Sequence, residues 1–229
     1  GGESHVTLVG QPELQAQNVV VPGDPSSAAF PLVAALITPD SKVLIRGVGM
    51  NERRTGLFEC LREMGAELES VPVASACGEP VADLTARTSR LRAVEVPPGR
   101  APSMIDEYPI LAVDAACANG ATVMHGLGEL RVKESDRLAS VVKGLNNCGV
   151  EALVDGDTLT VIGVGPDNVP VGAGKVVTHH DHRVAMAFLT LGLAGKQPVT
   201  VDDGSMIASS YPGFVDDMTL LGATIEPLA

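Results

Sequence analysis

The sequence predicts an α/β protein built from three copies of one βαβαββ unit. A register of apolar residues that ends in glycine occurs three times, and the three glycines Gly65, Gly149 and Gly222 lie 84 and 73 residues apart. Upstream of each register lies a segment that is apolar on nearly every side, which is typical of a helix buried all round. Hydrophobic residues make up 45% of the 229, enough for a substantial core.

The first copy begins at about Asn18. NVVVP predicts a short strand, a helix over FPLVAALI ends at Pro39-Asp40, and KVLIRGV predicts the next strand. An amphipathic helix then ends at Gly65, which suits a helix C-terminus because glycine adopts the left-handed conformation. AELESV and VADLTART predict the last two strands.

The second copy begins at about Arg90 and has the same order of elements. AVEVP, ATVMHGL, VEALV and TLTVIG predict strands, with a hairpin turn at Asp155-Gly156. YPILAVDAACA predicts the buried helix, and the amphipathic helix ends at Gly149. The third copy, from about Gly174, runs through GKVVTH, RVAMAFLTLGLAG, PVTVDD, the helix that ends at Gly222, and ATIEP, and it lacks the final strand.

These boundaries predict repeats at about 18–89, 90–173 and 174–229, the last one incomplete. Together residues 18–229 would form one domain. Residues 1–17 fit none of the copies, so we interpret them as the remnant of a preceding domain and the chain as part of a longer protein.

Composition excludes several classes of function. Lys and Arg number 16 against 28 Asp and Glu, a net charge of −12, which argues against a nucleic-acid partner. No apolar stretch approaches the roughly 20 residues of a membrane span, and the N-terminus shows no signal sequence. The four cysteines have no CxxC spacing, which favours reduced structural thiols in a cytoplasmic protein. They are Cys60, Cys77, Cys117 and Cys148.

The segment RVKESDR opens an amphipathic helix with Ser135 or the adjoining Asp near its N-cap. Arg137 then falls in the first turn, where the helix dipole disfavours a cation by about 0.3–1 kcal/mol. Lys133 lies four residues earlier and can converge with Arg137. Two cations beside free N–H groups suit a bound phosphate or carboxylate. A solvated capping box with incidental surface charges is an equally good explanation of the spacing.

The segment DHRVAM repeats this pattern, with Arg183 in the first turn of an apolar helix. His179 and His182 suggest a metal site, but no third ligand follows at a matching spacing and no HExxH occurs. We therefore expect no metal, and favour Asp181 as a helix cap with His182 near a polar cleft.

Acidic residues also stand at a helix start in SMIDEYP, where Asp106 and Glu107 precede a buried helix. They either stabilise the helix dipole or supply a general base in the same cleft as the two arginines. GDPSS occupies the equivalent place in the first copy, and its spacing favours a simple N-cap.

These motifs together resemble 5-enolpyruvylshikimate-3-phosphate synthase, in the C-terminal half and over essentially the whole chain. The residues that carry the resemblance are VPGDPSSAAFPLVAAL, APSMIDEYPILAV, LRVKESDRL, DHRVAMAF and TVDDGSMIASSYPGF, whose wording is most similar to the glyphosate-tolerant bacterial class. The resemblance implies βαβαββ units about a pseudo-threefold axis, with buried helices inside and sheets outside. The family's own N-terminus completes the third unit.

The resemblance also implies the reaction. The family transfers the enolpyruvyl group of phosphoenolpyruvate to the 5-hydroxyl of shikimate 3-phosphate, in aromatic amino acid biosynthesis, and needs no metal or organic cofactor. Carried over by motif, Asp106 matches the carboxylate that holds and deprotonates this hydroxyl, and Lys133 matches a lysine that contacts shikimate 3-phosphate. Glu134 matches the acid that shuttles the proton at C3.

The remaining matches concern phosphoenolpyruvate. Arg137 and Arg183 match the pair of arginines that bind it, and His182 matches a cleft histidine of less defined role. Two positions depart from the enterobacterial-type pattern: Ser209 stands where those enzymes carry a lysine, and Glu129 stands where they carry an asparagine.

The family's remaining substrate contacts come from an N-terminal half that this sequence does not contain. We therefore expect about half of an active site, with phosphoenolpyruvate, shikimate 3-phosphate and the N-terminal half of the enzyme as partners. The isolated chain is expected to be inactive. An anion-binding module of the same fold without catalysis is the alternative, and a different enolpyruvyl transferase is a third reading that the intact RVKESDR motif disfavours.

Overall fold

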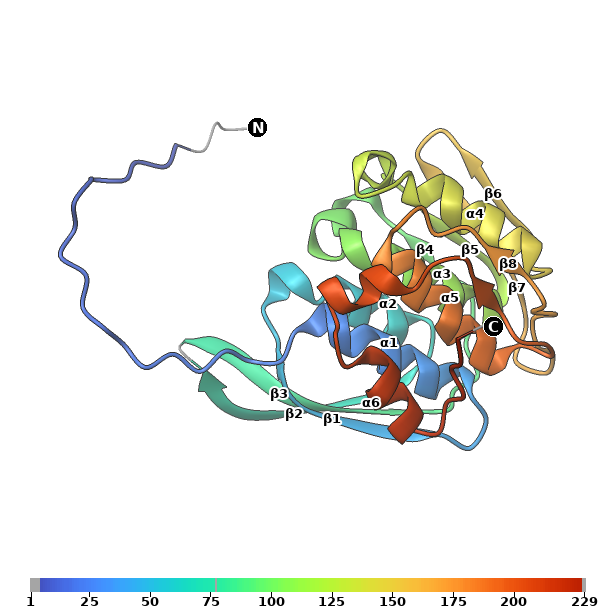
Figure 1. Cartoon of the computed structure of the whole chain (residues 1–229), viewed down its shortest axis with the longest axis horizontal. Coiled ribbons are helices and arrows are strands. Elements are labelled where there is room, and N and C mark those ends of the chain that lie inside the picture. The colour runs from blue at the N-terminus through green and yellow to red at the C-terminus, as the bar shows by residue number, and fades with distance from the viewer. Residues whose placement is uncertain (1–4, 77, 228–229) are drawn as a thin grey trace.

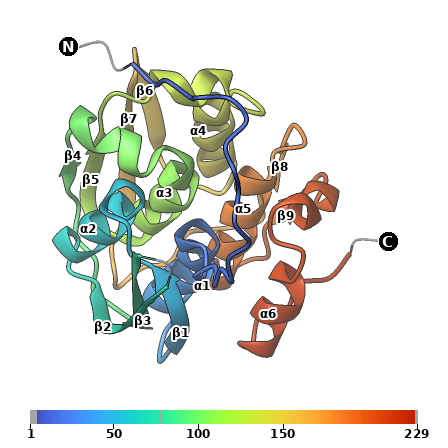
Figure 2. The same ribbon diagram turned by 90° about the vertical axis from the view of Figure 1, so that its left-hand side faces the viewer.

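A computed structural model of the chain describes residues 5–76 and 78–227. All but two of the predicted helices and strands occur, in the predicted order, and the α/β fold class is confirmed. The three long apolar segments form α1 (Pro25–Ile37), α3 (Tyr108–Cys117) and α5 (His182–Ala194). These helices lie side by side in the middle of the molecule, and the sheets lie outside them (Figure 2).

Burial of the three central helices explains their composition. Leu32, Leu111 and Leu191 have no exposed surface, and each fully buried leucine stabilises the fold by about 1.5–3 kcal/mol. The helices begin at side-chain caps where the sequence has aspartate. Asp24 caps α1 by accepting from the Ser27 amide at 2.9 Å.

The first unit places an antiparallel sheet over α1. The strand order is β1 (Lys42–Gly49), β3 (Glu79–Arg87) and β2 (Glu67–Ala76), and α2 (Gly56–Glu63) connects β1 to β2. Helix α2 ends at Glu63, and Gly65 two residues later has a φ of 89°, the left-handed conformation expected from the sequence.

The second unit has the most complete sheet, ordered β4, β5, β7, β6. Only β4 and β5 run parallel, and the predicted Asp155-Gly156 hairpin joins β6 to β7. The bounds are β4 (Glu95–Val96), β5 (Asn119–Met124), α4 (Arg137–Asn147), β6 (Ala152–Asp155) and β7 (Thr158–Val164).

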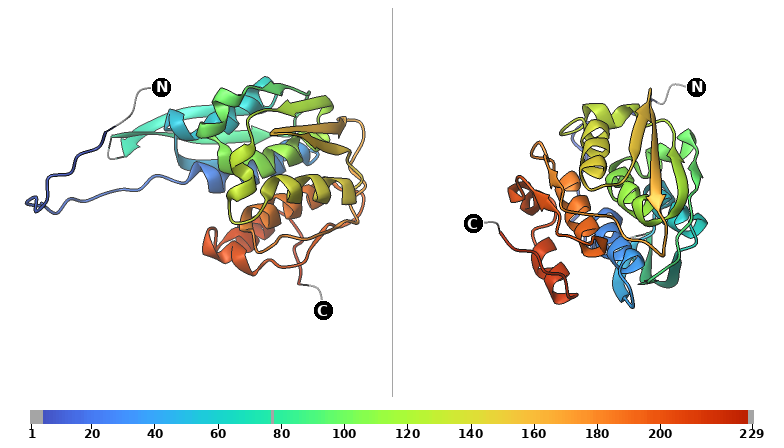
Figure 3. Two further views of the ribbon diagram at one scale, coloured as in Figure 1. Left: turned by 90° about the horizontal axis from the view of Figure 1, so that it is seen from above. Right: turned by 90° about the vertical axis from the view of Figure 1, so that its right-hand side faces the viewer.

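The third unit is reduced to a two-stranded parallel sheet of β8 (Lys175–Val176) and β9 (Thr200–Val201), with α5 and α6 (Phe214–Leu220). Helix α6 lies at the edge of the molecule (Figure 3) and packs through Phe214 against Phe30 of α1, with ring centroids 5.9 Å apart. Its outer apolar residues are partly exposed, since no further strand of the described chain covers them.

Two predicted strands are wrong. NVVVP forms no strand, and just after it Gly23 pairs with Val48 of β1 in an isolated bridge. ATIEP forms none either, because the strands of the third sheet are two residues long and offer no ladder for it to join. Residues 5–22 instead leave the body of the molecule as an extended arm (Figure 1).

Short 3₁₀ helices, which the periodicity did not predict, lie between the main helices and strands, and η3 carries Asp106 of the candidate site. They are η1 (Glu52–Arg54), η2 (Pro98–Ser103), η3 (Ile105–Glu107), η4 (Gly128–Val132) and η5 (Ser205–Ser209). Among the residues that the structure describes, no helix is long and apolar enough to cross a membrane.

Candidate active site

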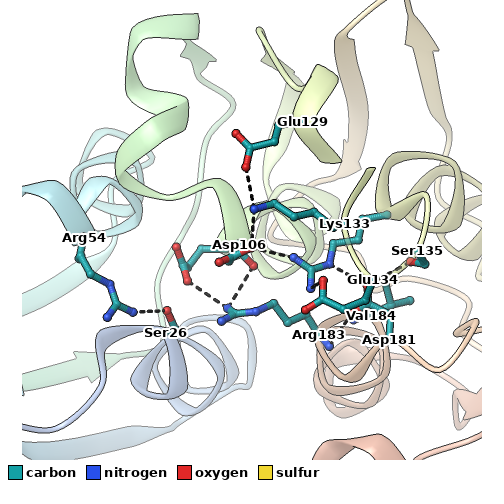
Figure 4. A network of polar contacts seen from close by, with 12 residues as sticks. Ser26, Arg54, Asp106, Glu129, Lys133, Glu134, Ser135, Asp181, Arg183 and Val184 are labelled. Carbon is teal, nitrogen blue, oxygen red and sulfur yellow. Dashed lines mark hydrogen bonds and ion pairs between the residues drawn. The ribbon is translucent and has the colours of Figure 1, made fainter. Parts of the chain in front are cut away.

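The charged residues singled out in the sequence meet where α3, α4 and α5 begin (Figure 4). Asp106 lies in η3 directly before α3, Arg183 lies in the first turn of α5, and the segment from Lys133 to Arg137 leads into α4. We call these residues the Asp106 cluster: Asp106, Lys133, Glu134, Arg137 and Arg183. Helix N-termini of two units therefore converge on one group of cations and carboxylates.

Arg137 lies at the centre of the cluster with no exposed surface. Its Nε donates to Asp181 Oδ2 at 2.7 Å and its Nη1 donates to Asp106 Oδ1 at 2.8 Å, while Nη2 contacts Glu134. Burial disfavours the charged guanidinium, but the surrounding carboxylates raise the pKa of Arg137 above its usual value. An arginine in the first turn of α4 is therefore balanced by acids from three segments.

Lys133 and Arg137 converge, as their spacing predicted, and they do so on Asp106. Lys133 Nζ lies 3.5 Å from Asp106 Oδ1 and 2.8 Å from Glu129 Oε1. Burial disfavours the ionised form of Asp106, but the neighbouring cations hold its pKa below the usual range. Asp106 is therefore an ionised carboxylate held between a lysine and an arginine.

Arg183 is held from the α3 side. Its Nη1 lies 3.1 Å from Glu107 Oε1 and 3.3 Å from the backbone oxygen of Asp106. Glu107 is only 6% exposed, and this burial raises its pKa, although Ser26 and Arg183 oppose the effect. Glu107 thus does more than stabilise the helix dipole, because it is the carboxylate partner of Arg183.

His182 occupies the first position of α5, next to the cluster. Burial and the nearby charge of Arg183 lower its pKa, so the imidazole is neutral at pH 7. Asp181 is the cap of α5, as expected, since its Oδ1 accepts from the Arg183 amide at 2.9 Å. The cap of α4 is Asp136, and Ser135 instead donates to Asp181 Oδ2 at 3.0 Å.

Comparison with known sequences decides the family. Residues 1–218 match the profile of EPSP synthase (3-phosphoshikimate 1-carboxyvinyltransferase). The chain belongs to the EPSP synthase family. The resemblance that the motifs predicted is therefore confirmed.

Individual relatives of the EPSP synthase family show the same likeness. A 3-phosphoshikimate 1-carboxyvinyltransferase of Rhodospirillum rubrum is 60% identical over 225 residues, which are 98% of this chain and 49% of that protein. One of Methylorubrum extorquens is 62% identical over 221 residues, covering 96% and 48%. An EPSP synthase structure from Acinetobacter baumannii superposes with a TM-score of 0.90 at 41% identity, covering 96% and 50%. The chain spans about half the length of the curated relatives it matches.

Arg54 of the first unit extends this EPSP synthase-like site and was missed in the sequence. Its Nη2 donates to Ser26 Oγ at 2.9 Å (Figure 4). The same nitrogen donates to Asp24 Oδ1 at 2.8 Å. The threefold register does not single out Arg54, because the position four before Leu57, which corresponds to Arg137 four before Val141, holds Arg53. The GDPSS segment is thus an N-cap that also binds an arginine.

A metal site and the cysteines were also considered from the sequence. Within residues 5–76 and 78–227, no cluster of three or more His, Cys, Asp or Glu side chains could hold a metal ion. His180 pairs with Asp203 at 2.8 Å. The described cysteines Cys60, Cys117 and Cys148 are free thiols, and Cys77 lies outside the described residues.

The arrangement is suited to anionic ligands. Guanidinium groups bind carboxylate and phosphate with paired hydrogen bonds, and the helix N-termini add partial positive charge. An ionised carboxylate, Asp106, lies between these cations with its side chain 37% exposed. Anion binding next to a general base is therefore the chemistry that the cluster can support.

Proposed function

We propose that this chain, together with the other half of the enzyme, transfers the enolpyruvyl group of phosphoenolpyruvate to the 5-hydroxyl of shikimate 3-phosphate and releases phosphate. The observation that carries the proposal is the position of Asp106, whose Oδ1 lies 2.8 Å from Arg137 Nη1 and 3.5 Å from Lys133 Nζ. The names of the curated relatives support the same reaction.

The cations divide between the two substrates. Arg137 and Arg183 bind the phosphate and carboxylate of phosphoenolpyruvate, for which the planar guanidinium is well shaped. Arg137 has no exposed surface in the free chain, so Asp106 or Glu134 moves away from its guanidinium when the substrate binds. Lys133 binds shikimate 3-phosphate, and Asp106 accepts a hydrogen bond from its 5-hydroxyl. His182 lies beside Arg183. Its neutral imidazole can donate one hydrogen bond to a substrate.

The residues then move two protons. Asp106 takes the proton of the 5-hydroxyl as its oxygen forms a bond to C2 of phosphoenolpyruvate, and Glu134 gives a proton to C3. The resulting tetrahedral intermediate loses the C3 proton to Glu134 while the C2–O bond to phosphate breaks, and Asp106 passes the hydroxyl proton to the departing phosphate. The enolpyruvyl ether and free phosphate are the products.

Substrate binding strengthens Asp106 as a base. Its pKa is held low by Arg183, Lys133 and Arg137, so the carboxylate alone binds a proton weakly. Anionic substrates neutralise these cations, and their own negative charge raises the pKa of a neighbouring carboxylate. The arrangement therefore activates the base only when both anions are in place.

The other half of the enzyme supplies the remaining substrate contacts. The relatives are about twice as long as this chain, and about half of each relative has no counterpart in it. We assign residues 18–229 to one domain, with repeats at 18–89, 90–173 and 174–229, and residues 1–17 to the preceding domain. The reaction takes place in the cytoplasm. The isolated chain has negligible turnover, because catalysis by positioning fails when half of the ligating groups are missing.

Phosphate release from phosphoenolpyruvate plus shikimate 3-phosphate tests the proposal. The chain is assayed alone and after mixing with the separately expressed N-terminal half of a close relative. Activity only on mixing is the expected result. Activity of the chain alone would contradict the need for a second half, and inactivity of a folded, associated mixture would favour the anion-binding module.

A further inference from the structure

Glu107 is a buried carboxylate at the junction of the three units. It lies at the end of η3, in the second unit, and contacts Arg183 of the third unit. On its other side lies Ser26 of the first unit, which opposes the rise in the pKa of Glu107 that burial causes. The Ser26 oxygen accepts from Arg54 Nη2 at 2.9 Å. Glu107 therefore lies between Ser26 of the first unit and the Arg183 guanidinium of the third.

The two arginines of the Asp106 cluster differ in the donors that they have left. Arg137 uses Nε, Nη1 and Nη2, each on a different carboxylate. Arg183 contacts other described residues only through Nη1 among its side-chain nitrogens, and both of those contacts come from the α3 side. The edge formed by Nε and Nη2 therefore remains available, and this edge binds a carboxylate or phosphate with two parallel hydrogen bonds.

We infer that Glu107 is a positioning residue: by holding Nη1 of Arg183 it turns the Nε–Nη2 edge toward phosphoenolpyruvate. This inference rests on the proposed function, in which Arg183 binds that substrate. Glu107 touches neither substrate, so it acts through Arg183 alone. Its burial makes the contact strong, since both side chains are largely removed from solvent, at 13% exposed for Arg183 and 8% for Glu107.

Kinetics of the mixed enzyme test the inference with a graded set of variants. Glu107→Gln keeps the shape and an acceptor oxygen but removes the charge. We expect it to raise KM for phosphoenolpyruvate about tenfold, with kcat and KM for shikimate 3-phosphate within about twofold, as for the loss of one charge-assisted hydrogen bond. Glu107→Asp keeps the charge and should recover part of the loss. Glu107→Gln with an unchanged KM for phosphoenolpyruvate would overturn the inference.

Glu63→Gln is the matched control. Glu63 binds Arg100, a guanidinium that is 15% exposed, with oxygen to nitrogen distances of 2.5 and 2.8 Å. The substitution Glu63→Gln thus removes the charged partner of a similarly buried arginine outside the Asp106 cluster. We expect its KM values to equal those of the unsubstituted enzyme. A rise in KM for phosphoenolpyruvate equal to that of Glu107→Gln would make the effect structural and contradict the inference.

A second measurement on the chain alone separates this inference from the proposed function. The Nε–H signal of Arg183 in ¹H–¹⁵N spectra, assigned by its loss in Arg183→Lys, reports on the edge in question. Phosphoenolpyruvate should shift this signal, and Glu107→Gln should weaken the apparent affinity about tenfold. If the mixed enzyme is inactive but this pattern appears, the proposed function fails and the positioning role stands. No shift in the unsubstituted chain, or equal affinities, would overturn the positioning role.

Discussion

Asp181 Oδ2 lies 2.7 Å from Nε of Arg137, and neither side chain is exposed to solvent. The other oxygen of Asp181 accepts from the backbone amides of Arg183 and Val184 and so caps α5. One carboxylate therefore ties the start of α4 to the start of α5. It also neutralises the buried guanidinium at the centre of the Asp106 cluster.

Asp181→Ala should destabilise the chain by about 3–5 kcal/mol, because it leaves the Arg137 guanidinium buried with one partner fewer. Loss of the α5 cap adds about 1 kcal/mol. Asp181→Asn keeps the cap oxygen and should cost less. Urea unfolding of the chain measures both variants. Asp167→Asn removes an exposed partner of Arg90 and should leave the midpoint unchanged; a similar midpoint for Asp181→Ala and Asp167→Asn would refute the argument.

Asp106→Asn should abolish general-base catalysis while sparing the fold. The amide cannot take the proton of a hydroxyl, so kcat of the mixed enzyme should fall by about 10²–10⁴. Asp106 is 37% exposed on its side chain, and its substitution leaves Arg137 two other carboxylates, so the unfolding midpoint should shift little. Steady-state phosphate release and thermal unfolding check the two parts. A kcat within threefold of the unsubstituted enzyme would exclude Asp106 as the base.

Glu129→Gln should tighten the binding of shikimate 3-phosphate. Glu129 Oε1 lies 2.8 Å from Lys133 Nζ, and this contact holds the lysine and raises its pKa. Because Glu129 is 62% exposed, the ion pair is worth at most about 1 kcal/mol, and KM for shikimate 3-phosphate should fall up to about fivefold. An increased KM would mean that Glu129 itself binds the substrate. KM for phosphoenolpyruvate is the internal control.

The sequence predicted those parts of the fold that depend on interactions between neighbouring residues, such as helix caps and left-handed glycines. A helix cap was expected within GDPSS and at Asp181, and Gly65 was expected as a left-handed terminus; the structure has caps at Asp24 and Asp181 and a positive φ at Gly65. Lys133 and Arg137 do converge, although Lys133 lies before the first residue of α4, so their contact with Asp106 comes from the extended segment and not from a shared helix face. The strand predicted over NVVVP does not form, because a strand also depends on long-range pairing with a neighbour, and beside β1 this pairing is limited to the isolated bridge between Gly23 and Val48.

The site was harder to predict where its contacts are long-range. Arg54 meets Ser26 across 28 residues of chain, and Arg137 meets Asp181 across 44. Sequence could indicate that arginines stood at helix starts, but tertiary packing selects the acid that each one contacts. The role of Glu107 belongs to the same class, because its partner Arg183 comes from another unit.

Asp114 makes the stability of the chain depend on pH. It lies in the middle of α3 with no exposed surface, and neither carboxylate oxygen has a hydrogen-bond partner among the described residues. Burial raises its pKa to about 8 from the usual 3.8. The folded chain therefore keeps this proton up to about pH 8, whereas the unfolded chain loses it near pH 4. The contribution of Asp114 to stability is lost as the pH rises through this window.

Asp114→Ala should consequently stabilise the chain, and by more at pH 7 than at pH 5. The difference in free energy of unfolding between variant and unsubstituted chain should grow by up to about 1.4 kcal/mol per pH unit in this range. Urea unfolding at pH 5, 6 and 7 measures it. Asp114→Asn is the matched control, because it removes the titration but keeps a buried polar group without a partner, so it should show the same pH trend with less stabilisation. A difference that stays constant from pH 5 to pH 7 would show that Asp114 ionises in the folded chain as an ordinary carboxylate does.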